Sequence, residues 1–313
     1  MAALGAGAAT VHAGDRLCRG FYHPEISKKP GGYPQGLAEH GYVEGQNFRF
    51  EFREANFQFG LLPILIRELV DQKVSVIIVD TSVQLRAAKA ATQSIPIVMG
   101  LGIDPVENGF VASLNKPGGN ITGVFNLGLT LTGKQFEILH ELVPSATKFA
   151  FLKDPGNTIL SQLAMPLVQA AADALGLSLL HVDAHTPDEF EAAFDTAARG
   201  GAEGMILGPD ALFQGLDATP QLVAVAARYR LPTIFLRERA VKAGGLISYG
   251  TDDDEAHRLK GRYAGRILKG EKPADLPVQQ STKTILSINL KTAKTLGITV
   301  PISLLGRADE VIE

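Results

Sequence analysis

The stretch that decides the fold is residues 74–82, which read Val-Ser-Val-Ile-Ile-Val-Asp-Thr-Ser. Its first six residues are nearly all apolar and rich in β-branched side chains, a pattern typical of a parallel strand that is covered on both faces. Asp80, Thr81 and Ser82 follow directly, and a helix is expected over 85–92. The stretch therefore predicts a strand, a polar loop and a helix in immediate succession.

The same alternation continues on both sides of this stretch. Apolar residues at helical spacing predict an amphipathic helix over 61–70, and a further strand is expected over 95–99. Later strands are expected at 148–152, 178–182, 205–207 and 232–235, with helices at 160–175, 188–199 and 221–229. A weak internal similarity aligns residues 90–98 with 226–234 and is consistent with a duplication. This rhythm predicts an α/β chain with two lobes, each built on a parallel sheet.

Length and composition restrict the classes of function. A chain of 313 residues favours two domains over a single small module. The net charge of −3 offers no polybasic face, so no binding of nucleic acid or anionic lipid is expected. A lone cysteine, Cys18, excludes an internal disulfide framework and a site made of several thiolates.

The first residues have the character of an export signal. Residues 1–13 are small and mostly apolar, and Val11 and Ala13 occupy the −3 and −1 positions of a cleavage site before Gly14. No Lys or Arg precedes the apolar run, which departs from the usual pattern, and a disordered Ala/Gly tail is the alternative interpretation. The first interpretation predicts an exported, periplasmic protein whose residues 1–13 are the remnant of a signal peptide.

Signatures of catalytic and metal sites are absent from the sequence. It contains no Gly-x-Ser-x-Gly elbow, no phosphate loop with Gly-Lys-Ser/Thr and no His-Glu-x-x-His motif. His181, Asp183 and His185 alternate along an extended stretch and would share one face, but a polar strand end that enters a loop explains them more simply. We therefore expect no cofactor, no metal and no catalytic residue.

Candidate binding residues follow from a rule of open parallel sheets. Ligands bind beyond the carboxyl ends of the strands, where helix N-termini present free N–H groups. The polar residues and glycine at those ends are Asp80, Thr81, Ser82, Gly102, Asp104, Asn126, Asp154, Asn157, Asp210, Arg237 and Glu238. Most of these residue types also suit helix caps or turns, so their shared position carries more weight than any single residue.

Several longer phrases are more specific than these positions. They are Gly-Leu-Ala-Glu-His-Gly-Tyr-Val-Glu-Gly-Gln-Asn at 36–47, Asp-Pro-Val at 104–106, Leu-Asn-Lys-Pro-Gly-Gly-Asn-Ile-Thr-Gly-Val at 114–124, Arg-Ile-Leu-Lys-Gly-Glu-Lys-Pro at 266–273, and the tail segments 289–294, 300–301 and 308–313. Together they resemble the ATP-binding-cassette (ABC) transporter substrate-binding proteins, in the branch that includes tryptophan- and tyrosine-binding members. The resemblance covers about 36–313 and implies a type I periplasmic-binding-protein fold, with two Rossmann-like lobes that are joined by three crossovers and close on a small solute in the cleft between them.

The expected division places an N-terminal lobe at 14–123, a C-terminal lobe at 124–250 and crossover segments that return to both lobes at 251–313. Family members usually open with a strand, whereas 14–34 shows no clear apolar strand, so that strand is expected to be missing or irregular. The implied function is that of the periplasmic solute-binding component of an ABC uptake transporter. Such a protein binds a small, amino-acid-like molecule as a monomer and delivers it to a membrane permease without turnover.

The resemblance also implies roles for particular residues. Thr81 and Ser82 would offer hydroxyls and a helix N-terminus to a carboxylate, while Asp210 or Asp154 would meet an ammonium group. Phe213 would stack on an apolar or aromatic part of the solute, with packing in the lobe core as the alternative. The two residues on the loop after the last strand of the second lobe would close over the solute, namely Arg237 and Glu238.

Two other classes of function remain open at this point. An α/β enzyme, such as an isomerase or lyase, would use Asp104, Asp154 and Asp210 as acid and base, and a perturbed pair of carboxylates would favour it. The effector-sensing domain of a regulator shares the expected architecture, although no helix-turn-helix or basic segment precedes it.

Overall fold

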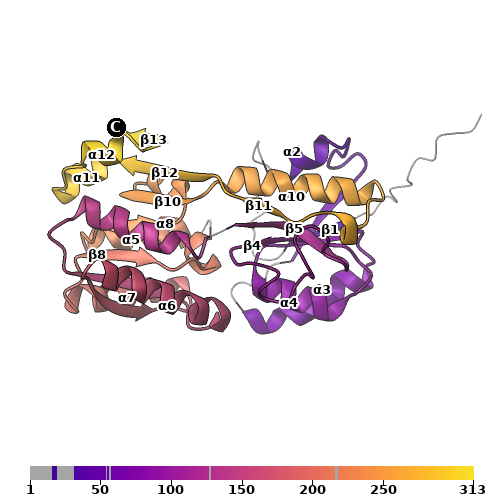
Figure 1. Ribbon diagram of the computed structural model, residues 1–313, viewed down its shortest axis with the longest axis horizontal. Helices are drawn as coiled ribbons and strands as arrows, with labels where there is room; N and C mark the ends of the chain where they lie inside the picture. The colour runs from indigo at the N-terminus through magenta and orange to yellow at the C-terminus, as the bar shows by residue number, and fades with distance from the viewer. Residues whose placement is uncertain (1–15, 20–31, 54, 56–57, 127, 216–217) are drawn as a thin grey trace, which may run out of the picture. The chain divides into compact units, whose positions relative to one another are not determined.

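The computed structural model of the chain describes residues 16–19, 32–53, 55, 58–126, 128–215 and 218–313 (Figure 1). The chain forms two compact units, of which unit 1 comprises Met1–Asn126 and Asp253–Ser281 and unit 2 comprises Leu127–Asp252 and Thr282–Glu313. The sequence placed the first boundary after residue 123, whereas strand β5 (Ile121–Asn126) lies entirely in unit 1. The expected signal-peptide remnant, residues 1–13, lies outside the described residues.

Unit 1 is built on a sheet whose described strands follow the order β11-β5-β4-β3-β1-β2. Every pair of neighbours among these described strands is parallel. Besides β5, the strands of this sheet are β1 (Arg16–Arg19), β2 (Arg49–Phe52), β3 (Val76–Val79), β4 (Ile97–Leu101) and β11 (Gln279–Ser281). All four residues of β3 are buried, as its uninterrupted apolar run predicts for a central strand.

The expectation of a missing or irregular strand in 14–34 differs from the structure at β1. This strand pairs in parallel with β2 on one side and β3 on the other, and Cys18 lies in register with both Glu51 and Ile77. Backbone hydrogen bonds to two neighbours hold a strand in a sheet without requiring an apolar run of its own. The segment 20–31 lies outside the described residues.

Two helices of unit 1 approach each other unusually closely (Figure 1). They are α2 (Tyr33–Ala38) and α10 (Asp253–Leu268). A Cβ on Gly36 would lie 2.0 Å from the carbonyl oxygen of Arg258, and a Cβ on Gly261 would lie 2.3 Å from the carbonyl oxygen of Tyr33. Only glycine leaves room for the two backbones to meet at these positions. The other helices of the unit are η1 (Phe59–Leu61), α3 (Leu62–Asp71), α4 (Ser82–Ala91) and η4 (Pro273–Asp275).

Unit 2 contains a second sheet, whose described strands follow the order β13-β12-β10-β9-β8-β6-β7. They are β6 (Lys148–Lys153), β7 (Ser178–Asp183), β8 (Gly204–Leu207), β9 (Thr233–Phe235), β10 (Ile247–Thr251), β12 (Thr284–Asn289) and β13 (Glu310–Ile312). Strands β10 and β12 pair antiparallel, and the remaining described pairs are parallel. The C-terminal segment thus adds strands to the sheet of unit 2.

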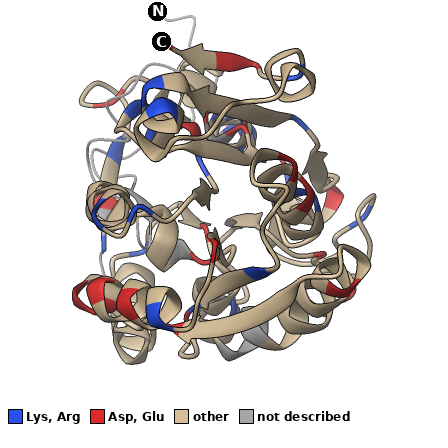
Figure 2. Cartoon of the chain, turned by 90° about the vertical axis from the view of Figure 1, so that its left-hand side faces the viewer, with Lys and Arg blue, Asp and Glu red and all other residues tan. Residues whose placement is uncertain are grey.

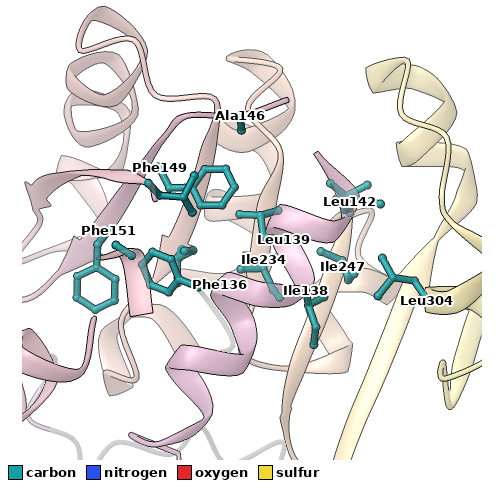
Figure 3. Packing of buried hydrophobic residues seen from close by; sticks show 14 of the residues in the cluster. Phe136, Ile138, Leu139, Leu142, Ala146, Phe149, Phe151, Ile234, Ile247 and Leu304 are labelled. Atoms are coloured by element: carbon teal, nitrogen blue, oxygen red, sulfur yellow. The ribbon is translucent and has the colours of Figure 1, made fainter. Parts of the chain in front are cut away.

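The core of unit 2 lies between this sheet and α5 (Leu131–Leu142) (Figure 3). The rings of Phe136 on α5 and Phe149 on β6 have their centroids 6.4 Å apart, and Leu304 belongs to the same buried cluster. The other helices of the unit are α6 (Thr158–Ala174), η2 (Pro187–Glu189), α7 (Phe190–Arg199), η3 (Ala211–Gln214), α8 (Ala218–Arg228), α9 (Glu238–Lys242), α11 (Leu290–Leu296) and α12 (Ile302–Leu305). The strands and helices expected from the sequence are present, with small shifts at their ends.

Charged residues of both signs are distributed along the chain, consistent with its near-neutral net charge. Figure 2 shows Lys and Arg interspersed with Asp and Glu along the helices and strands. Within the described ranges, no helix has both the length and the apolar character that a membrane crossing requires.

Candidate functional site

The end of β3 leads directly into the N-terminus of α4, a helix of 10 residues. Thr81 caps this helix, since its Oγ1 accepts a hydrogen bond from the N–H of Gln84 at 3.2 Å. In return, Gln84 Oε1 accepts hydrogen bonds from the N–H groups of Asp80 at 2.8 Å and Thr81 at 3.2 Å. Helix geometry leaves the first N–H groups, those of Ser82 and Val83, without intrahelical acceptors. An anion is favoured at this position by the helix dipole.

A buried ion pair lies beside this helix N-terminus. Asp80 Oδ1 is paired with Lys260 Nζ of α10, and the two side chains are only 8% and 5% exposed. Tyr33 Oη of α2 donates to both oxygens of Asp80, at 2.9 and 3.0 Å. The Lys260 ammonium also lies 5.0 Å from the centre of the Tyr33 ring. Sequence reasoning noted Asp80 as a polar strand end but missed Tyr33 and Lys260, which come from elements distant in the chain.

The loop after β4 and the end of β5 meet at the same edge of the sheet. A Cβ on Gly102 would lie 3.7 Å from Asn126 Oδ1, so these two candidates are brought together. Asn126 lies in register with Ser281 of β11, whose buried Oγ has no hydrogen-bond partner in the part of the chain that the structure describes. Asp104 instead forms a turn, since its Oδ1 accepts from the N–H of Val106 at 2.7 Å and of the following residue at 3.1 Å.

In unit 2, three candidates form a cluster at the carboxyl ends of β6 and β8. Asp210 Oδ2 accepts a hydrogen bond from Asn157 Nδ2 at 2.7 Å, and its Oδ1 accepts from the N–H of Leu212 at 2.8 Å, which caps η3. Asp154 Oδ1 accepts from the N–H of Gly156 at 2.8 Å. The Asp154 carboxylate also lies 3.3 Å from Nδ1 of a residue that sequence reasoning did not connect with it, His185.

The two carboxyl groups of this cluster have raised pKa values. Burial raises the pKa of Asp210 to about 6; the hydrogen bond from Leu212 lowers it, and the nearby charge of Asp154 adds to the rise. Burial also raises the pKa of Asp154, against the hydrogen bond from Gly156. A cation brought to the cluster would restore the ionised form of both groups. A perturbed pair is what the enzyme alternative required, but backbone N–H groups engage both carboxylates.

The last three candidates have partners within unit 2. Phe213 is 3% exposed, and its ring centroid lies 6.0 Å from that of Phe190 on α7, so it packs in the core. Arg237 is the N-terminal flanking residue of α9, and its Nη1 donates to the carbonyl oxygen of Thr251 at 2.9 Å. Glu238 forms an ion pair of 2.9 Å with a lysine one turn later, Lys242.

The three residues considered as metal ligands, His181, Asp183 and His185, do not form a common site, since Asp183 and His185 contact different partners. Asp183 forms an ion pair of 2.6 Å with Lys153, while His185 lies against Asp154. Burial lowers the pKa of His181, which favours its neutral form. Over the described ranges, no three His, Cys, Asp or Glu side chains are placed to hold a metal ion.

Known proteins are similar to this chain in both sequence and architecture. The family model for the ABC transporter substrate binding protein matches residues 20–312. A tyrosine-binding protein of Clostridioides difficile (strain R20291) is 27% identical over 276 residues, which are 88% of this chain and 78% of the relative. The structure of an ABC domain in complex with L-Trp from Streptococcus pneumonia has a TM-score of 0.82 and 25% identity, and the match covers 95% of this chain and 99% of that chain.

A more distant structure shows the fold alone. The periplasmic binding protein/LacI transcriptional regulator from Alkaliphilus metalliredigens has a TM-score of 0.56 at 11% identity, over 87% of this chain and 97% of that chain. The predicted type I periplasmic-binding-protein fold is thereby confirmed. Because the family model spans nearly the whole chain, the protein belongs to the ABC transporter substrate-binding protein family.

Proposed function

We propose that this protein is the periplasmic solute-binding component of an ABC uptake transporter, and that its solute is an amino acid. The observation that carries the proposal is that the carboxyl ends of the strands offer groups of opposite preference. Unit 1 offers a helix N-terminus that favours an anion, and unit 2 offers a buried pair of carboxyl groups that favours a cation. An amino acid carries both charges. The names of two similar proteins, which specify tyrosine and L-Trp as ligands, support this solute class.

The carboxylate of the solute would bind at the start of α4. Ser82 and Val83 provide the first N–H groups of the helix, and Thr81 already holds the backbone in the capped conformation. A charge at a helix N-terminus gains about 0.3–1 kcal/mol on an exposed surface and up to about 2 kcal/mol in a partly buried site. This interaction therefore contributes to affinity but does not supply all of it.

The ammonium of the solute would bind at the cluster of Asp154 and Asp210. Asp154 Oδ1 accepts from the N–H of Gly156 and lies 3.3 Å from His185 Nδ1, while Asp210 Oδ1 accepts from the N–H of Leu212. A carboxylate has about four lone-pair sites, and an ammonium carries three donors. Asn157 orients Asp210 through its amide. An ammonium placed here replaces the missing solvent around buried carboxylates, so binding and ionisation support each other.

The remaining parts of the proposal concern the role of the protein in uptake. We propose that the protein acts in the periplasm as a monomer. Solute binding would select a closed state that a membrane permease recognises. The solute would be released chemically unchanged. The carboxylates Asp154 and Asp210 would then act as binding groups and not as acid and base.

Isothermal titration of the purified chain against amino acids, sugars and carboxylic acids tests the proposal. We expect an aromatic amino acid to bind, and its decarboxylated amine and its N-acetyl derivative to bind far more weakly, because each removes one of the two charges. Binding at about 100 times the dissociation constant should stabilise the protein by about 2.7 kcal/mol in thermal unfolding. Binding of another solute class with no response to amino acids would overturn the proposal.

The enzyme alternative calls for a second measurement, because the raised pKa values of Asp154 and Asp210 are its one favourable observation. The bound amino acid should be recovered with unchanged mass and unchanged stereochemistry after prolonged incubation with the protein. A changed product that forms in proportion to the protein present would replace the binding function with catalysis.

A further inference from the structure

We infer that Lys260 controls the charge that the solute meets at the N-terminus of α4, by neutralising Asp80, and that it is a positioning and specificity-determining residue for the anionic group of the solute. The inference rests on the proposed function. It concerns a residue of the crossover helix α10, 180 residues away from Asp80 in the sequence.

The charge of Asp80 lies close to the proposed anion site. Asp80 directly precedes Thr81, the capping residue of α4, and both N–H groups converge on the same Gln84 oxygen. The helix dipole stabilises a carboxylate in this position, but the carboxylate repels a second anion that binds at the same helix end. Because the side chain is only 8% exposed, water and salt screen this repulsion weakly.

Lys260 offsets the repulsion between Asp80 and a solute anion, and contacts with neighbouring residues hold its side chain in position. Its ammonium is ion-paired with Asp80 and lies 5.0 Å from the centre of the Tyr33 ring. The side chain crosses the backbone of β4 at Gly100, where an added Cβ would lie 2.7 Å from Nζ and 2.9 Å from Cδ. Glycine at this position therefore leaves the path that the lysine needs to reach the end of β3.

The close contact of α2 and α10 brings both partners of Asp80 into place. Gly261, the residue after Lys260, lies against the backbone of Tyr33, so the register of the two helices is set at this point. Tyr33 Oη then bridges both oxygens of Asp80, which holds the carboxylate in one orientation towards Lys260. The packing of α2 against α10 in unit 1 thus positions the ion pair of Asp80 and Lys260.

An independent observation is a buried hydrogen-bond donor at the start of α4, the side-chain amide of Gln84. Gln84 is fully buried, and its Nε2 has no hydrogen-bond partner within the described ranges. Since its Oε1 accepts from Asp80 and Thr81, this amide lies at the start of α4. A buried donor without an acceptor is costly, and a carboxylate oxygen of a solute would satisfy it.

The test measures L-tyrosine binding by isothermal titration to the full chain and to variants of the pair. Lys260→Met leaves the Asp80 charge alone and should weaken binding about tenfold, whereas Asp80→Asn leaves the Lys260 charge alone and should strengthen it several-fold. The double variant is neutral, like the wild-type pair, and should bind within about threefold of wild type. Lys134→Met breaks an exposed ion pair on α5 and serves as the matched control with unchanged binding.

The opposite signs separate a charge effect from loss of structure. A purely structural role of the pair predicts weaker binding in both single variants, and that result would overturn the inference. Should a single variant fail to fold, the double variant must still differ from the remaining single variant in the stated direction. L-tyrosinamide, which has no carboxylate, should lose the difference between Lys260→Met and Asp80→Asn. If wild type binds no amino acid at all, the proposed function fails; if it binds and the variants show no ordering by charge, only this inference fails.

Discussion

The buried carboxyl group of Asp210 should make the stability of the protein depend on pH. Burial raises its pKa from 3.8 to about 6, the hydrogen bond from Leu212 opposes the rise, and the charge of Asp154 adds to it. A carboxyl group with a higher pKa in the folded than in the unfolded protein stabilises the fold when it is protonated. This stabilisation is complete below a pH of about 3.8 and is lost as the pH rises through about 6.

The size of the effect follows from the two pKa values. A difference of about two pKa units corresponds to about 3 kcal/mol between the protonated and ionised limits. Asp210 is 4% exposed, so solvent screening reduces this figure little. Between pH 4.5 and pH 7.5 the linkage relation leaves a change of about 2 kcal/mol. The change is smaller than the full difference because the carboxyl group of the unfolded protein is already mostly ionised at pH 4.5.

Urea unfolding of the solute-free protein across this pH range is the assay. The free energy of unfolding of wild type should fall by about 2 kcal/mol relative to Asp210→Asn as the pH rises from 4.5 to 7.5. Taking the difference between the two proteins cancels the titration of those carboxylates that do not interact with Asp210; Asp154 is the neighbour whose charge is coupled to it. Ile302→Ala, at a residue that is 86% exposed and carries no titratable group, is the control and should keep the wild-type pH dependence.

Parallel pH curves for wild type and Asp210→Asn would refute the reasoning, because they would show that Asp210 is ionised equally in the folded and unfolded protein. A loss of stability in the variant at every pH, without a change of slope, would report only its altered hydrogen bond to Asn157. The slope of the difference curve is therefore the quantity to compare.

Three further predictions concern binding and packing. Binding of an amino acid at pH 6 should release protons, measured by titration calorimetry in buffers of different ionisation enthalpy, because the ammonium lowers the raised pKa of Asp210; no dependence on buffer would contradict this. Gly261→Ala should destabilise unit 1 by about 1–3 kcal/mol in urea unfolding, since its Cβ would lie 2.3 Å from a carbonyl oxygen, whereas Gly60→Ala, with open space around it, should change stability by less than about 0.5 kcal/mol. Phe136→Ala should cost about 3–5 kcal/mol by opening a cavity in the core of unit 2, while Ile302→Ala, at a residue 86% exposed, serves as the control with little effect; equal losses would argue against the described core.

Local pattern was enough to predict many of the helices and strands, though not all of them. The apolar runs of β3 and β4 and the amphipathic spacing of α3 were recognisable because side-chain periodicity follows directly from backbone geometry. Strand β1 was not recognisable, since its residues carry no apolar pattern and its place in the sheet depends on pairing with β2 and β3. The phrases shared with the family identified the fold as a whole.

The local roles of several site candidates could also be predicted from sequence. Thr81, Asp104 and Asp210 accept hydrogen bonds from N–H groups two or three residues further on, which is the behaviour expected of these residue types after a strand. The binding roles proposed for Thr81 and Asp210 remain predictions. Phe213 shows the limit of this reasoning, because its place in the core depends on its contact with Phe190 of another helix.

Sequence alone indicated the alternation of strands and helices over much of the chain, residue types suited to caps at several of their ends, and the family of the chain. Only the tertiary structure decided that Tyr33 and Lys260 would meet Asp80, and that His185 would lie against Asp154. Partners that lie 47 and 180 residues apart along the chain leave no periodic signal, because packing of whole elements, through contacts such as the glycines between α2 and α10, places them together. Burial, and with it the shifted pKa of Asp210, is likewise a property of the packed unit and not of the local sequence.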